Sequence, residues 1–190
     1  MQLTRFTDYT LRVLISVGLN DKRRERRGVT IGEISAQYNV SRNHLMKVVQ
    51  HLARAGYLET LRGKGGGLRL ARPAAEINIG RVVRDVEGAF HVVPCFDETR
   101  ENLCVIVPAC VLRNVLGKAL GAFLDVLDAY TLEDLLGPDR QLASLLAAGA
   151  AGSAPASALA AGAADDTPAA DTAGPAPGAG RAAKRTRASA

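Results

Sequence analysis

The fold is decided by residues 30–71, which run TIGEISAQYNVSRNHLMKVVQHLARAGYLETLRGKGGGLRLA. Thr30 and Glu33 form a capping-box pattern, which predicts that a short helix begins there and extends to about Tyr38. Ser41 is placed to cap a second helix that runs to about Arg54. Four apolar residues of this second helix recur at helical spacing and predict one buried face: Leu45, Val48, Val49 and Leu52.

A hairpin is predicted directly after these two helices. Residues 57–62 and 68–71 alternate between apolar and polar side chains, as strands do, and residues 63–67 form a basic, glycine-rich tip. Two helices joined by a tight turn and followed by such a hairpin define a winged helix-turn-helix. We therefore predict a mainly α fold with a small β-hairpin wing.

Further amphipathic helices flank this stretch. Apolar spacing predicts helices at residues 7–19, 79–88 and 111–129. The last of these is long and has a broad apolar stripe, and Pro108 is a suitable residue for its first turn. A second capping pattern at residues 131–134 predicts a short helix that extends to Leu136.

Charge and composition divide the chain of 190 residues into four parts. Residues 1–90 carry 16 Lys and Arg against 8 Asp and Glu, whereas residues 91–146 carry 4 against 8. Ala, Gly and Pro make up 30 of the last 44 residues, which predicts a tail without a core. The expected organisation is a winged-helix region at 1–88, a cysteine segment at 89–110, a long and a short helix at 111–146, and a tail at 147–190.

The excess of basic residues predicts that the winged-helix region binds DNA. The major groove of DNA admits one α-helix, whose N-terminal side chains reach the base edges. Five residues of the first turns are expected to contact DNA: Ser41, Arg42, Asn43, His44 and Lys47. Arg42 and Asn43 suit base edges, whereas Ser41 and Lys47 suit phosphates. From the wing, Arg62, Lys64 and Arg69 are expected to contact the DNA backbone or the minor groove. The glycine-rich tip is not a nucleotide-binding loop, because it lacks the Gly-Lys-Ser/Thr ending and opens no helix.

Several classes of protein are disfavoured. No apolar run approaches the ~18 residues of a membrane span, and no apolar stretch typical of a signal peptide follows the N-terminal charges. We therefore expect a cytoplasmic protein with no membrane partner. No paired carboxylates, nucleophile elbow or phosphate loop is evident, so we do not expect an enzyme.

The three cysteines, Cys95, Cys104 and Cys110, lie within 16 residues. An odd number of clustered cysteines points to metal or redox chemistry rather than to a disulfide framework. Thiolates bind zinc and iron–sulfur clusters, but structural zinc sites usually include a pair two to four residues apart, which is absent here. The spacing favours a loop around a larger cluster, and zinc, a redox thiol switch and unreactive thiols stay open.

Five stretches together resemble the winged-helix family of iron–sulfur transcription regulators, and in particular its nitric-oxide-sensing repressors. They are MQLTRFTDYTLR (1–12), VSRNHLMK (40–47), RAGY (54–57), RGKGGG (62–67) and PAC (108–110). The resemblance covers residues 1–146 and is densest in the winged-helix region. It implies a repressor that binds near-palindromic operator DNA as a homodimer through the helix at 111–129, with nitric oxide as its effector.

The resemblance also implies an iron–sulfur cluster of the 4Fe–4S type, with 2Fe–2S as the alternative, bound by the three cysteines. In the family the fourth ligand can be a carboxylate from the partner's first helix, which matches Asp8. An alternative role for Asp8 is the N-cap of its own helix. Arg12, one turn further on, is placed to pair with a carboxylate near the cluster.

One departure concerns the first two cysteines, which are closer together in the family than here. Cys95 is therefore the least certain ligand, with His91 as a substitute. Family members that regulate cluster biogenesis use a histidine shortly after the third cysteine, where this chain has Arg113. Such a regulator of iron–sulfur status, and a zinc or thiol redox regulator, are the alternative functions.

Overall fold

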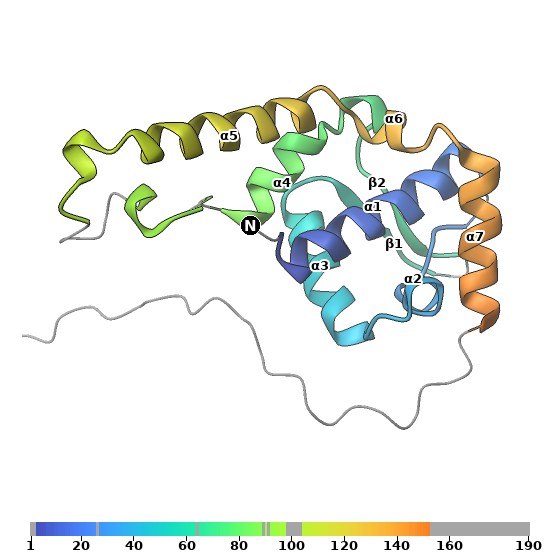
Figure 1. Cartoon of the computed structure of the whole chain (residues 1–190). Helices are drawn as coiled ribbons and strands as arrows, with labels where there is room; N and C mark the ends of the chain where they lie inside the picture. Colours follow the sequence, from blue (N-terminus) through green and yellow to red (C-terminus); the bar gives the residue numbers. More distant parts are fainter. Residues whose placement is uncertain are drawn as a thin grey trace, which may run out of the picture. The chain divides into compact units, whose positions relative to one another are not determined.

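In a computed structural model, helix α1 (Arg5–Lys22) lies among the other helices of the winged-helix region (Figure 1). The structure describes residues 3–25, 27–63, 65–88, 90, 92–97 and 104–152. Thr4 caps α1 by accepting a hydrogen bond from the Thr7 backbone N–H, and Val13, Leu14 and Val17 are fully buried. Helix α1 is longer than predicted, because its cap lies at Thr4.

The predicted helix-turn-helix is confirmed. Helix α2 (Ile31–Tyr38) begins with the predicted capping box, in which Thr30 and Glu33 satisfy each other's backbone N–H groups. Asn39 adopts the left-handed conformation that turns the chain. Helix α3 (Arg42–Arg54) follows and buries the four predicted apolar residues. The position of Ser41 before α3 is also as predicted, but its side chain makes no capping hydrogen bond.

The wing is a two-stranded antiparallel sheet of β1 (Leu58–Leu61) and β2 (Gly67–Leu70), in which Leu58 pairs with Leu70. Val29 joins its edge through a bridge to Leu68, with both backbone hydrogen bonds formed. Gly67, at φ +145°, lies so close to the Gly28 backbone that a side chain at either position would collide. The loop before α2 is thereby tied to the wing.

Helix α4 (Ile79–Glu87), the last helix of the winged-helix region, packs against helix α5 (Val111–Asp128). Asn78 caps α4, and its amide nitrogen also donates to the Asp128 carbonyl at 2.7 Å. Arg84 makes two hydrogen bonds of 2.6 Å to the Asp128 carboxylate. The C-terminal end of α5 is therefore fastened to α4 by both backbone and side-chain contacts.

Helix α5 begins at Val111, as predicted, but Pro108 does not lie in its first turn. Pro108 belongs to a separate short 3₁₀ helix, Val107–Ala109, and α5 begins after it with Cys110 as its cap. The Cys110 Sγ accepts a hydrogen bond from the Arg113 backbone N–H at 3.4 Å. Cys110 thus caps α5, and Pro108 precedes the cap.

Two helices follow α5. Helix α6 (Leu132–Leu135) has the predicted capping box at Thr131 and Asp134. Helix α7 (Asp139–Gly152), which was not predicted, packs along α2 (Figure 1). It extends past residue 147, where the tail was expected to begin, because alanine favours helix and because Leu142, Ala143 and Leu146 pack on the core. Residues 153–190 of the predicted tail lie outside the described residues.

Candidate nucleic-acid interface and cysteine segment

The residues predicted to contact DNA from the helix-turn-helix lie at the start of α3. All five are exposed: Ser41, Arg42, Asn43, His44 and Lys47. Because the Ser41 side chain does not cap the helix, the first backbone N–H groups of α3 are accessible from outside. Such a helix end favours a phosphate oxygen. The exposure of these residues agrees with the predicted recognition helix, and contacts to bases and phosphates stay predictions.

Two aromatic side chains of α1 pack against two histidine side chains of α3. The Tyr9 ring stacks on the His44 ring at a centroid distance of 6.1 Å, and Phe6 meets His51 edge-on at 5.6 Å. These two contacts hold the first and the last turns of α3. The N-terminal part of α1, where Asp8 also lies, thus contacts both ends of α3.

The wing residues are placed in three different ways. Arg62 is exposed beside the tip, as expected for a contact to the DNA backbone. Arg69 is half-buried, and its guanidinium donates to the Glu25 carbonyl at 3.0 Å, so it fastens the wing to the loop after α1. Lys64 lies outside the described residues. The DNA contacts of all three stay predictions.

The pKa values of two side chains in the helix-turn-helix are shifted by their contacts with neighbouring residues. A hydrogen bond from Arg27 is the main reason that the pKa of Glu33 falls to about 2, and the Thr30 backbone and hydroxyl lower it further. Burial raises the pKa of Tyr38, which ends α2. The Arg12 guanidinium lies 5.4 Å from the centre of the Tyr38 ring. Helix α1 therefore contacts both helices of the motif.

Asp8 is not an N-cap, so that alternative is wrong: Thr4 is the cap, and Asp8 lies within the first turn of α1. Its carboxylate accepts a hydrogen bond from Arg12 Nε at 2.9 Å, which confirms the predicted pairing of Arg12 with a carboxylate. The Asp8 side chain is 45% exposed. A carboxylate in this position is accessible to a ligand from outside its own chain.

The cysteines lie between α4 and α5 as free thiols. Cys104 is exposed, whereas Cys95 and Cys110 are partly buried. Among the residues that the structure describes, no three Cys, His, Asp or Glu side chains converge as a metal site. His91 and residues 98–103 lie outside that part of the chain. The binding set therefore stays a prediction.

The donor chemistry of the three cysteines nevertheless fits an iron–sulfur cluster. All three side chains are thiols, the ligand type that such clusters use, and none is consumed in a disulfide. Cys110 lies at the N-terminus of an 18-residue helix and accepts a backbone N–H there.

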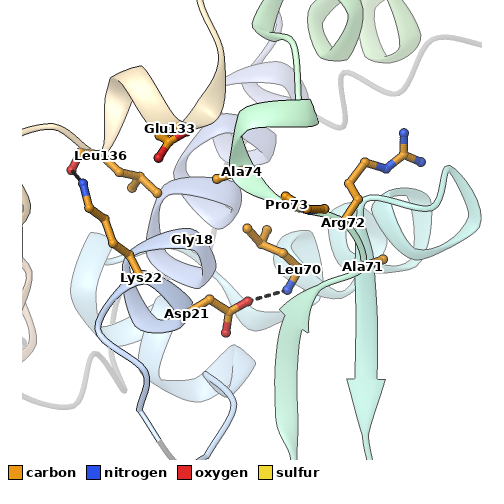
Figure 2. Close-up of a pocket in the computed structure, with 10 residues that line it drawn as sticks. All are labelled: Gly18, Asp21, Lys22, Leu70, Ala71, Arg72, Pro73, Ala74, Glu133 and Leu136. Atoms are coloured by element: carbon orange, nitrogen blue, oxygen red, sulfur yellow. Dashed lines mark hydrogen bonds between the residues drawn. The ribbon is translucent and has the colours of Figure 1, made fainter.

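A cavity of about 470 Å³ lies between α1, the end of β2 and α6 (Figure 2). Asp21 accepts the Leu70 backbone N–H at 2.8 Å, and Lys22 Nζ donates to the Leu136 carbonyl at 2.8 Å. These polar groups connect the surrounding elements to one another. None of the predicted DNA-contacting or cluster-binding residues lines this cavity.

Comparison with known proteins identifies the class to which this arrangement belongs. Residues 3–138 match the Rrf2 family model, described as an iron-dependent transcriptional regulator. The chain belongs to the Rrf2 family of transcriptional regulators.

Within that family, the chain is similar to several NsrR proteins. The HTH-type transcriptional regulator NsrR of Bacillus subtilis (strain 168) is 49% identical over 148 residues, which cover 77% of this chain and 97% of the relative. NsrR of Geobacillus kaustophilus (strain HTA426) is 49% identical over 146 residues, with the same coverage. The relatives are named transcriptional regulators and not enzymes, as the sequence predicted.

The solved structures agree with the winged-helix assignment. CymR, the global cysteine regulator of B. subtilis, superposes with a TM-score of 0.57 at 27% identity, covering 71% of this chain and 95% of CymR. Within the described ranges, no helix combines the length and the hydropathy that crossing a membrane requires.

Proposed function

We propose that this chain is an iron–sulfur-dependent, nitric-oxide-sensitive repressor that binds near-palindromic operator DNA as a homodimer. The observation that carries the proposal is the set of three free thiols between the winged-helix region and α5, in a chain that is 49% identical to NsrR. Cys95, Cys104 and Cys110 bind the cluster, of the 4Fe–4S type, and Asp8 of the second subunit completes the set. When bound, the cluster supplies iron to which nitric oxide binds.

The exposed apolar surface of α5 supports the homodimer. None of the 18 residues of α5 is buried, although most of them are apolar. Val111 and Leu112 are 73% and 63% exposed, and Val115 and Val126 are also largely exposed. Leaving such a stripe in water is unfavourable by roughly 25 cal/mol per Å². Pairing with a second α5 would remove this surface from water.

The contacts of α1 support a connection between the cluster and the DNA. Asp8 lies next to Tyr9, which stacks on His44 of the recognition helix, and one turn before Arg12, which covers Tyr38 of α2. A displacement of Asp8 therefore moves Tyr9 and Arg12, whose side chains contact α3 and α2. Binding or release of Asp8 shifts the recognition helices, whose separation in a dimer must match about one turn of DNA.

The test is to purify the full chain without oxygen, measure bound iron and sulfide, and titrate nitric oxide against retention of operator DNA. We expect a coloured protein that releases DNA as nitric oxide is added. C95A, C104A and C110A should each lose iron and sulfide. A colourless chain that cannot be loaded enzymatically with iron and sulfide would contradict the cluster. DNA binding that is equal in the intact, nitrosylated and cluster-free forms would contradict the sensing.

Asp8 needs its own control, because Asp8→Asn also breaks the ion pair with Arg12. We expect Asp8→Asn to change the visible spectrum of the loaded protein and its rate of reaction with nitric oxide. Arg12→Ala removes the same ion pair and should leave the spectrum unchanged, as should Glu76→Gln, which alters an exposed carboxylate outside α1. Equal spectra for Asp8→Asn and the original protein would show that Asp8 is not a ligand.

The DNA interface makes a separate prediction. Arg42→Ala removes a base-edge donor and should weaken operator binding by about 1–3 kcal/mol while relaxing specificity at one base pair. Arg62→Ala should weaken binding to all sequences alike and lower the salt dependence by about one phosphate contact. Fluorescence anisotropy with operator and unrelated duplexes at several salt concentrations separates the two effects. The same loss of specificity in both variants would contradict this division of roles.

A further inference from the structure

Helix α3 exposes one apolar side chain among polar ones. Of the described residues between 3 and 88, Met46 is the only large apolar residue that is exposed, with 50% of its surface accessible. The other large apolar residues of α3 are all buried: Leu45, Val48, Val49 and Leu52. Met46 is therefore turned away from the core that its neighbours build, and burial of apolar surface within the chain does not account for it.

The neighbours of Met46 on the surface of α3 are polar or basic. Four exposed residues lie beside it or one turn away: Arg42, Asn43, Lys47 and Gln50. Helical side chains point towards the N-terminus of their helix, so Met46 extends over the turn that holds Arg42 and Asn43. That turn is the part of a recognition helix that reaches base edges. An apolar protein partner would bury Arg42 and Lys47 without opposite charges, whereas DNA phosphates neutralise them.

We propose that Met46 contacts the C5 methyl group of a thymine in the major groove and so determines specificity at that base pair. Among the groups that base pairs present in this groove, the thymine methyl is the apolar one. Methionine suits such a contact because its unbranched, flexible side chain adapts to the position of the methyl group. The inference rests on the proposed DNA binding by the winged-helix region and does not depend on the cluster.

The experiment removes the methyl group from the DNA and the side chain from the protein. The full chain, purified without oxygen, first selects its preferred sequence from a pool of random 30-base-pair duplexes. Each thymine of that duplex is then replaced in turn by deoxyuridine, which lacks only the C5 methyl group, and affinity is measured by fluorescence anisotropy. At the contacted thymine we expect binding to weaken about three- to fivefold, the effect of one methyl group lost from an apolar contact. Met46→Ala should bind the thymine and deoxyuridine duplexes equally, because the two changes remove the same contact.

Two further variants separate this contact from a general loss of affinity. Met46→Leu keeps an apolar side chain and should retain a preference for thymine, whereas Gln50→Ala alters the same face and should leave that preference unchanged. The inference would be overturned if no thymine were sensitive to deoxyuridine, or if Met46→Ala kept the full sensitivity, although DNA binding itself would stand in both cases. A change in the sedimentation of DNA-free Met46→Ala would indicate that a second copy covers Met46, and would also overturn it. A chain that selects no duplex would contradict the DNA binding and this inference together.

Discussion

The winged-helix region and α5 both have apolar faces but use them in opposite ways. In the winged-helix region, α1, α3 and α4 bury their apolar faces in one core, where Leu14, Leu45 and Val82 are almost inaccessible to water. Helix α5 is as long as α1 and yet has no buried residue. The first region is complete as a single chain, whereas the second has a surface that a second copy would cover.

The strongest test of this contrast is the same substitution in the two regions. Leu14→Ala, at 0% exposure, should reduce the free energy of unfolding by about 2–5 kcal/mol because it leaves a cavity. Leu112→Ala should change the free energy of unfolding by less than about 0.5 kcal/mol when the protein is dilute. Chemical denaturation at several protein concentrations provides the measurement.

The effect of Leu112→Ala on the free energy of unfolding should depend on the protein concentration. If α5 pairs with a second copy, Leu112→Ala becomes destabilising as the concentration rises, because only the folded chain dimerises. The effect of Leu14→Ala should persist at every concentration. A Leu112→Ala variant that is equally stable at all concentrations and sediments like the original protein would show that this part of α5 does not pair.

Substitutions of two glycines test the contact between α4 and α5. A side chain at Gly80 in α4 would collide with Asp128 of α5, including its backbone nitrogen, so Gly80→Ala must separate the helices. We expect a loss of about 1–3 kcal/mol. Gly117 in α5 has no neighbour within 4 Å, and Gly117→Ala should instead stabilise the chain by about 0.5–1 kcal/mol through helix propensity. Thermal unfolding measures the stability of both variants. Changes of the same sign in the two variants would contradict the close contact between α4 and α5.

The sequence was most informative where local patterns decide the structure. The capping boxes at Thr30 and Thr131 and the buried stripe of α3 depend on residues a few positions apart, and all three were predicted correctly. Helix α7 was missed because its alanines resemble a tail, and its stability comes from packing on α2, which is distant in sequence. Thr4 was missed as the cap of α1 because Asp8 has equal capping chemistry.

The candidate site was less predictable for a related reason. The polar face of α3 follows from helical periodicity, so its exposed residues could be named from the sequence. Arg69 looked equivalent to Arg62, but its contact with Glu25 depends on how the wing folds back on the loop after α1. The proposed cluster site combines a segment after α4 with a residue of α1 in another subunit. Such a combination does not follow from spacing along one chain.

The smallest expected effect concerns the cap of α2, where charge and hydrogen bonding can be separated. The pKa of Glu33 is lowered from 4.5 to about 2, mainly by Arg27, so the ionised form stabilises the fold. This contribution is fully present above about pH 4.5 and is lost as the pH falls through about 2. Glu33→Gln keeps a capping side chain but removes the charge. It should be less stable than the original at pH 6, and the difference should shrink steadily as the pH is lowered towards 3.

Thr30→Ala is the matched control for this prediction. It removes the hydroxyl that accepts the Glu33 backbone N–H and should cost about 1 kcal/mol. That bond is between uncharged groups, so its share of the cost should be the same at pH 6 and pH 3. The Thr30 hydroxyl also donates to the Glu33 carboxylate at 2.9 Å, and only the share of that bond should shrink with the pH. The cost of Thr30→Ala should therefore fall less between the two pH values than the cost of Glu33→Gln. Urea denaturation at the two pH values measures both. A stability difference for Glu33→Gln that stays constant with pH would mean that the Arg27–Glu33 ion pair does not stabilise α2, and that hydrogen bonding alone holds this end of the helix-turn-helix.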